Sequence, residues 1–225
     1  MTSSRTGNKK SKASRTAERA DALAHFKRTD IHFYNATLAH HRALPISLSG
    51  KRTRAALFQS LVSIVISQQL GVAAADTIFA RVQKACAGRL TPLSILSLPL
   101  ETFHAAGLSG AKTKTLKEIA SAVEDGSLDL LALKKTSTEE AIQKLMAVWG
   151  LGPWSVEMFL MFALGERDIF SPGDLGLIRS MEALYGLPKD TPKEKLAALS
   201  KKWSPYRTYA CLLLWRTRDT KAGSN

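Results

Sequence analysis

The segment from Leu145 to Val156 holds two glycines in a short turn between apolar stretches, and it could bind an anion. Gly150 and Gly152 permit positive φ angles and allow another backbone to approach closely. Pro153 follows, at a position that favours the first turn of a helix. Because a helix N-terminus attracts negative charge, the amides after this turn suit a phosphate group. An ordinary glycine-capped turn between two helices has the same pattern, so both interpretations stand.

An acidic residue, Asp174, precedes an amphipathic run that predicts a helix over 175–185. Asp is a preferred N-cap residue, and capping is the simplest reason for its presence there. The same place helps to keep the carboxylate ionised, because the positive end of the helix dipole stabilises negative charge. An ionised carboxylate can stabilise a developing positive charge or orient an attacking water molecule. The two roles are compatible, and the run alone does not separate them.

The elements that must position these residues are helices, because helical spacing of apolar residues dominates and strand alternation is nearly absent. We expect helices at about 18–43 (one or two), 54–69, 72–87, 112–123, 153–164, 175–185, 193–200 and 206–216. Another helix should start at Ser137, which has a glutamate three positions later, as in a capping box. The stretch 153–164 is apolar nearly all round, which predicts a central buried helix. The fold class is therefore all-α.

Composition and charge limit the class of partner. The chain has 225 residues with 32 Lys and Arg against 19 Asp and Glu, a formal net charge of +13 that favours a polyanion such as nucleic acid or an anionic membrane. We expect residues 1–17 to be a disordered basic tail, 18–218 to be one helical domain and 219–225 to be a flexible C-terminus. We find no signal peptide and no apolar run of membrane-spanning length. The two cysteines, Cys86 and Cys211, are too few for a four-cysteine metal site.

Several motifs, in order along the chain, are similar to those of one protein family. Asp174 lies twenty positions after Trp154 of the glycine hairpin. Ile66-Ser-Gln-Gln-Leu-Gly71 and Pro205-Tyr-Arg-Thr-Tyr-Ala210 are two further motifs, and Ala106–Lys112 is a weaker match. With these motifs the chain resembles the helix-hairpin-helix Gly/Pro-Asp DNA glycosylase superfamily, and within it the 3-methyladenine DNA glycosylase II family.

The resemblance implies a two-lobed helical fold, with a helix-hairpin-helix motif at about 139–164 and an active-site cleft between the lobes. It implies a monofunctional DNA glycosylase of base excision repair. Such an enzyme flips alkylated bases, of the 3-methyladenine or 7-methylguanine type, out of double-stranded DNA and hydrolyses their glycosidic bond, leaving an abasic site. Asp174 would be the catalytic carboxylate that stabilises the oxocarbenium ion. Double-stranded DNA containing alkylated bases would be the partner, bound by a monomer without membrane association.

The resemblance also assigns a base pocket to Trp154, Met158 and Trp215, whose aromatic rings would stack on a cationic base. Trp154 stands where bifunctional relatives carry a Schiff-base lysine, and an indole cannot form an imine. Plain core packing is the alternative for Trp154 and Met158. Gln69 or Leu70 would fill the gap left by the flipped base, although a polar helix end explains Gln69 equally well.

Contacts with the DNA backbone would come from Gly150, Gly152 and Ser155 of the hairpin. The hairpin would also hold a structural monovalent cation, Na⁺ or K⁺, on the backbone carbonyls of three residues, which are Met146, Val148 and Leu151. No other cofactor is expected. The chain departs from many relatives at two positions, because Trp149 stands in place of proline and Gly173 in place of an acidic residue.

Other functions fit part of the sequence. A non-catalytic helix-hairpin-helix DNA-binding module would share the hairpin and the charge, but Asp174 at its spacing argues against it. A glycosylase for other lesions is a second alternative, and a bifunctional glycosylase/lyase would need a lysine at Trp154. An all-α scaffold protein would need neither residue. We expect an intracellular protein located with DNA, in a bacterial cytoplasm or nucleoid or in a eukaryotic nucleus.

Overall fold

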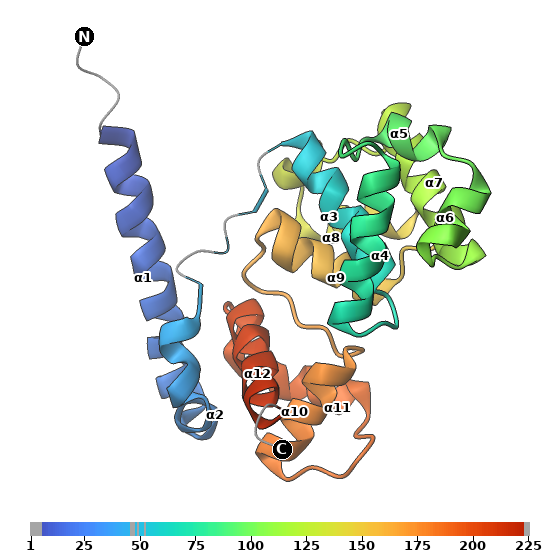
Figure 1. The fold of residues 1–225 in the computed structure, drawn as a ribbon. Helices are drawn as coiled ribbons and strands as arrows, with labels where there is room; N and C mark the ends of the chain where they lie inside the picture. The colour runs from blue at the N-terminus through green and yellow to red at the C-terminus, as the bar shows by residue number, and fades with distance from the viewer. Residues whose placement is uncertain (1–5, 46–47, 49, 52, 223–225) are drawn as a thin grey trace. The chain divides into compact units, whose positions relative to one another are not determined.

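The structure is a computed structural model and describes residues 6–45, 48, 50–51 and 53–222 (Figure 1). These residues form helices and connecting turns with no strand among them, so the all-α prediction is confirmed. The chain divides into two compact units, in keeping with the expected two-lobed fold. We call Gly50–Gly165 the central unit, and Met1–Ser49 together with Glu166–Asn225 the terminal unit. The cleft expected between the lobes stays a prediction.

The central unit is built around α3, a helix buried over most of its surface. Its elements are α3 (Arg54–Ser67), α4 (Val72–Ala85), α5 (Pro92–Ser97), α6 (Leu100–Ala106), α7 (Gly110–Glu124), η2 (Ala132–Lys135), α8 (Thr138–Met146), α9 (Pro153–Phe159) and η3 (Leu160–Leu164). Leu57, Leu61 and Val65 of α3 are fully buried, and α3 packs against α4, α7 and α9. Burial of each such side chain contributes about 1.5–3 kcal/mol. α3 is therefore the support on which the predicted hairpin helix rests (Figure 1).

The two helices of the predicted hairpin begin where the sequence indicates. Ser137 caps α8 by accepting a hydrogen bond from the backbone N–H of Glu140 at 3.1 Å. α9 begins at Pro153 and continues into η3, one turn of π-helix. Phe159 and Leu160 at this junction are fully buried, so the prediction of a central buried helix over 153–164 is confirmed. π-helical turns often accompany functional sites because they shift the side chains that follow.

The terminal unit joins both ends of the chain. It comprises α1 (Thr6–Thr29), α2 (Ile31–Ala36), η1 (Leu38–Ala43), α10 (Leu175–Tyr185), α11 (Lys193–Ser200), η4 (Lys201–Trp203) and α12 (Arg207–Ala222). α10 and α12 lie side by side (Figure 1). The Ser180 hydroxyl of α10 donates a hydrogen bond to the Leu214 carbonyl of α12 at 3.0 Å. This contact fixes one helix against the other.

A buried carboxylate, Asp30, holds together the start of α2, the end of α10 and η4. It accepts hydrogen bonds from the Tyr185 hydroxyl at 2.5 Å and the Trp203 indole at 3.0 Å, and it pairs with Lys202 at 2.8 Å. Burial alone would raise the pKa of this carboxyl group, but the hydrogen bonds from Lys202 and Tyr185 outweigh burial and lower it. Because every contact is internal, we assign Asp30 a structural role.

The two ends of the chain differ from the prediction. α1 begins at Thr6, so residues 6–17 of the expected disordered tail are helical, and residues 1–5 lie outside the described residues. α12 reaches Ala222, within the expected flexible C-terminus, and 223–225 lie outside the described residues. Lys, Arg and Ala are good helix formers, and a helix that is already nucleated extends one residue at a time. No helix among the described residues is long and apolar enough to span a membrane.

Candidate active site and DNA interface

The two glycines of the hairpin meet different surroundings. Gly150 has a φ of +84°, and a Cβ atom there would lie 2.0 Å from the Thr115 hydroxyl of α7. Glycine at this position is therefore required by the packing of the protein itself. Gly152 has a φ of −90°, and a Cβ atom there would meet nothing within 4 Å. The fold does not need glycine at 152, so the open space there can admit an external group.

Ser155, which we predicted to contact DNA, has a side chain that faces the protein. It is 2% exposed, and its hydroxyl accepts a hydrogen bond from Gln68 Nε2 at 2.8 Å. The same Gln68 nitrogen donates to the Gly150 carbonyl at 3.2 Å. Only the backbone amide of Ser155, in the first turn of α9, can serve the predicted phosphate contact. Burial of a small hydroxyl at this point is explained by its hydrogen bond to Gln68.

The predicted gap-filling residues lie in the turn between α3 and α4. Gln69 has a φ of +57°, in the left-handed region, and Leu70 is 39% exposed. The ammonium of Lys112 in α7 donates to the carbonyls of Ile66 and Gln68, each at 2.7 Å. Burial lowers the pKa of Lys112. The side chains of the turn therefore face solvent, while the backbone at the start of the turn is held by the partly buried ammonium of Lys112.

A cavity of about 570 Å³ lies within the central unit and contains two of the three predicted pocket residues. It is lined by Lys51, Ser60, Ser63, Ile64, Ser67, Leu70, Val72, Trp154, Met158 and Phe162. Trp154, Met158 and Phe162 follow one another at four-residue steps along α9 and η3, and they therefore form one wall. The cavity size lies within the range of small-molecule sites.

Asp174 and Trp215 belong to the terminal unit. Asp174 is the N-cap of α10, and its Oδ1 accepts hydrogen bonds from the Leu177 N–H and from Trp215 Nε1, both at 2.9 Å. Trp215, predicted as a wall of the base pocket, thus contacts the carboxylate directly. A Cβ atom at Gly176 would lie 3.0 Å from Asp174 Oδ1, 3.1 Å from Trp215 Cδ1 and 3.2 Å from Arg218 Nη1. Glycine at 176 lets α12 bring the indole to the carboxylate.

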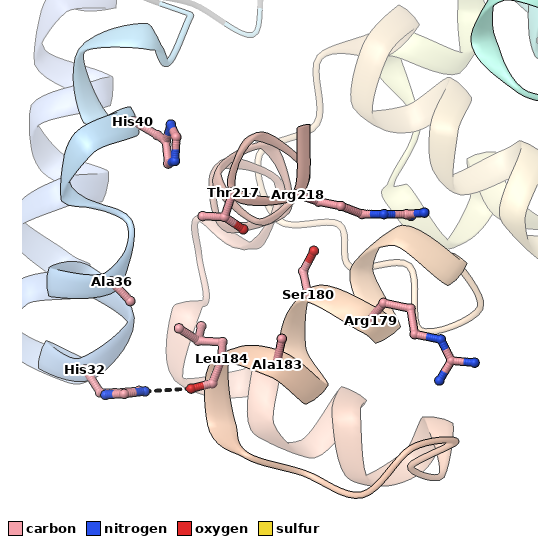
Figure 2. A pocket seen from close by; sticks show the side chains of 9 residues that line it. All are labelled: His32, Ala36, His40, Arg179, Ser180, Ala183, Leu184, Thr217 and Arg218. Atoms are coloured by element: carbon pink, nitrogen blue, oxygen red, sulfur yellow. Dashed lines mark hydrogen bonds between the residues drawn. The ribbon is translucent and has the colours of Figure 1, made fainter. Parts of the chain in front are cut away.

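A second cavity, of about 410 Å³, lies in the terminal unit among α2, η1, α10 and α12 (Figure 2). Several of its polar side chains have internal partners. His32 is hydrogen-bonded to the Leu184 carbonyl at 2.8 Å, and Ser180 and Thr217 donate to the Leu214 carbonyl. Because no Trp, Tyr or Phe lines this cavity, whereas Trp154 and Phe162 line the other one, we assign the candidate base pocket to the cavity of the central unit.

The backbone around the hairpin fits the predicted cation. Met146 is the last residue of α8, and the last carbonyls of a helix lack partners within that helix. The Val148 carbonyl accepts a hydrogen bond from the Leu151 N–H at 3.1 Å, and a carbonyl oxygen has a second lone pair. Carbonyl oxygens suit Na⁺ or K⁺. Binding of a cation here stays a prediction. In the part of the chain that is described, no group of three His, Cys, Asp or Glu could hold a metal ion.

Sequence reasoning missed three residues of this arrangement. Phe162 follows Met158 by four positions, and continuing the Trp154–Met158 spacing by one step would have found it. Gln68 contacts a residue 82 positions away, and Lys112 contacts residues 44 and 46 positions away. No local pattern signals such distant hydrogen bonds.

Comparison with known proteins places this arrangement in a family. Residues 62–205 match the HhH-GPD superfamily of base excision DNA repair proteins. The chain is 34% identical, over 163 residues, to DNA-3-methyladenine glycosylase 1 of Schizosaccharomyces pombe, covering 71% of this chain and 72% of that protein. The chain therefore belongs to the HhH-GPD superfamily, and it is a DNA glycosylase of the 3-methyladenine glycosylase type.

Two solved structures share most of this fold. The DNA-3-methyladenine glycosidase of Bacillus halodurans has a TM-score of 0.73 at 34% identity, covering 90% of this chain and 91% of that one. The 3-methyladenine DNA glycosylase of Schizosaccharomyces pombe, in complex with abasic DNA, has a TM-score of 0.78 at 29% identity, covering 88% and 97%. The comparisons therefore agree with the sequence predictions of the family, of the helical fold and of binding to DNA.

Proposed function

We propose that this enzyme hydrolyses the glycosidic bond of alkylated purines, of the 3-methyladenine or 7-methylguanine type, in double-stranded DNA. The observation that carries the proposal is the Asp174 carboxylate, fixed at the N-terminus of α10 by N–H donors from Leu177 and Trp215. A fixed carboxylate stabilises the oxocarbenium ion that forms on the sugar. The named activity of the relatives, which are 3-methyladenine DNA glycosylases, supports the substrate class.

The reaction needs little more than this carboxylate. The bond between the sugar C1′ and the base nitrogen breaks, and its electron pair leaves with the base. An N-alkylated purine is cationic before cleavage and leaves as a neutral base, so protonation by a general acid is unnecessary. Water then adds to C1′, and its proton passes to Asp174 or to solvent. Hydrolysis leaves an intact strand with an abasic site.

The cavity of the central unit supplies the receptor for the flipped base. Trp154 and Phe162 offer aromatic surfaces, and Met158 closes the apolar wall between them. Aromatic rings attract a cationic base more strongly than a neutral one, which favours alkylated over normal purines. Lys51 is the charged residue among the lining side chains, and its positive charge works against this preference.

DNA binding would come from the hairpin and from the turn between α3 and α4. The open space beside Gly152 and the amides that begin α9 would receive a phosphate. Gln69 or Leu70 would enter the duplex and fill the gap left by the flipped base. The backbone carbonyls of Met146, Val148 and Leu151 would hold a Na⁺ or K⁺ ion, whose positive charge would strengthen the attraction for phosphate. We expect the enzyme to act as a monomer, which gel filtration with light scattering would test.

The proposal is tested with a panel of duplexes, each carrying one lesion: 3-methyladenine, 7-methylguanine, hypoxanthine or 8-oxoguanine. We expect release of the alkylpurines as free bases and a strand that breaks only after alkali. Borohydride should trap no covalent adduct, because Trp154 offers no amine. The proposal fails if neither alkylpurine is released, and the hydrolytic mechanism fails if borohydride captures the enzyme on DNA.

A further inference from the structure

Gln68 lies where three parts of the central unit meet. Its side-chain nitrogen donates to the Gly150 carbonyl at 3.2 Å and to the Ser155 hydroxyl at 2.8 Å, one on each side of the Gly152 opening. Gln68 is also the C-cap of α3, and the exposed turn with Gln69 and Leu70 begins there. One amide group therefore ties the projecting turn directly to the hairpin.

The same residue is also held through its backbone carbonyl. The Lys112 ammonium donates to the backbone carbonyls of Ile66 and Gln68, both at 2.7 Å. Beyond this tie, Gln69 has a φ of +57°, a left-handed conformation that a side chain adopts only when its surroundings impose it. The bonds made by the Gln68 side chain and accepted by its carbonyl hold the residue directly before Gln69. The start of the turn is thus bonded both to the hairpin and to α7.

The turn also forms one edge of the cavity. Ser67, Leu70 and Val72 line the cavity together with Trp154 and Met158. Leu70 is 39% exposed and Val72 is 79% exposed, so the edge carries apolar side chains that face solvent. The Gln68 contacts therefore link the residues beside the Gly152 opening to the edge of the cavity.

We propose that Gln68 is a positioning residue that fixes the Gln69–Leu70 turn relative to the DNA phosphate bound by the hairpin. This inference rests on the proposed function. Its consequence is specific, because a gap-filling turn matters only when a paired base must leave the stack. Extraction of a paired base costs unpairing and unstacking energy, and that cost is smaller for a base without a partner. Gln68 should therefore matter most for lesions in fully paired DNA.

The test compares Gln68→Ala with Gln143→Ala, a matched control in which the same side chain is removed from an exposed site on α8. Single-turnover excision of 7-methylguanine is measured in two duplexes, one with cytosine opposite the lesion and one with an abasic site opposite it. Loss of two hydrogen bonds predicts an excision rate about tenfold lower for Gln68→Ala in the paired duplex. In the duplex with the opposing abasic site, the rate should change by less than about twofold. Gln143→Ala should match the wild type in both.

Hydrogen exchange of the free protein gives a second measurement that needs no catalysis. In Gln68→Ala, the amides of Leu70 and of the hairpin at Gly150 and Leu151 should exchange faster, while those within α5 and α6 should not. Lys112→Met removes the bonds to the Ile66 and Gln68 carbonyls, and it should loosen the turn but leave the Gln68 contacts with the hairpin. It serves as the test if Gln68→Ala does not fold.

Equal losses of excision in both duplexes would overturn the inference, since they indicate a general structural role for Gln68. Unchanged excision in the paired duplex would overturn it as well. If the wild-type enzyme releases no alkylpurine, the proposed function fails, and the hydrogen-exchange result alone then decides whether Gln68 couples the turn to the hairpin. Unchanged exchange at the turn and at the hairpin would count against that coupling.

Discussion

Alanine at Gly150 should mainly lower the stability of the protein, whereas alanine at Gly152 should mainly weaken DNA binding. At Gly150 the φ of +84° costs an L-residue roughly 1–2 kcal/mol. A Cβ atom 2.0 Å from the Thr115 hydroxyl also forces the turn or α7 to move, at a further cost of about 1–3 kcal/mol. Together these effects predict that Gly150→Ala unfolds on the order of 10 °C below the wild type. Removing the hydroxyl with Thr115→Ala in the same chain should restore part of the loss.

Gly152→Ala should remain folded, because a Cβ atom there meets nothing within 4 Å and the backbone conformation is open to any residue. Replacing glycine at the N-cap costs less than about 1 kcal/mol. A methyl group in the path of a phosphate should weaken affinity for undamaged duplex about tenfold. Thermal unfolding and fluorescence anisotropy at one fixed salt concentration measure both quantities. Wild-type DNA affinity in Gly152→Ala, or a loss of stability equal to that of Gly150→Ala, would refute this account of the hairpin.

Three further substitutions test other contacts. Trp215→Phe keeps an aromatic ring but removes the N–H that Asp174 accepts, so single-turnover excision should fall about ten- to a hundredfold while DNA affinity holds; a change within twofold would contradict this. Asp30 has a lowered pKa, so its contribution to stability is present above the pKa of the unfolded chain, near 3.8, and is lost as pH falls through the lower folded value. Asp30→Asn should therefore lower the Tm at neutral pH by on the order of 10 °C and flatten its decline in acid, and an unchanged acid decline would count against it. Lys51→Met removes a positive charge from the cavity and should raise excision of cationic 7-methylguanine relative to neutral hypoxanthine about two- to fivefold, whereas an equal change for both lesions would exclude a charge effect.

The sequence predicted the helices well where apolar periodicity and capping residues agree. The range 175–185 expected after Asp174 matches α10, and Pro153 begins α9 as its fixed φ favours. The ends of α1 and α12 were not predicted, because low hydrophobicity argues for disorder while Lys, Arg and Ala still favour a helix. Composition alone cannot decide between these two tendencies.

The sequence indicated which pocket residues lie together better than it indicated their hydrogen bonds. Trp154 and Met158 do share one cavity, as four-residue spacing on a helix indicates. The bond from Trp215 to Asp174 joins residues 41 positions apart, and it depends on Gly176 leaving room between α10 and α12. The burial of Ser155 likewise depends on Gln68, which is 87 positions away. Such tertiary contacts leave no periodic trace in the sequence.

The role of the Asp174 carboxylate is the central claim, and Asp174→Asn tests it most directly. Asparagine keeps the size and caps a helix about as well as aspartate, and its Oδ1 can still accept from Leu177 and Trp215. Only the negative charge is lost, so the Tm and the affinity for DNA should remain near wild type. Excision of 7-methylguanine should fall by about two to three decades, the loss expected when a charged stabiliser of the transition state is removed. A folded Asp174→Asn enzyme that excises 7-methylguanine within a few-fold of wild type would contradict the account.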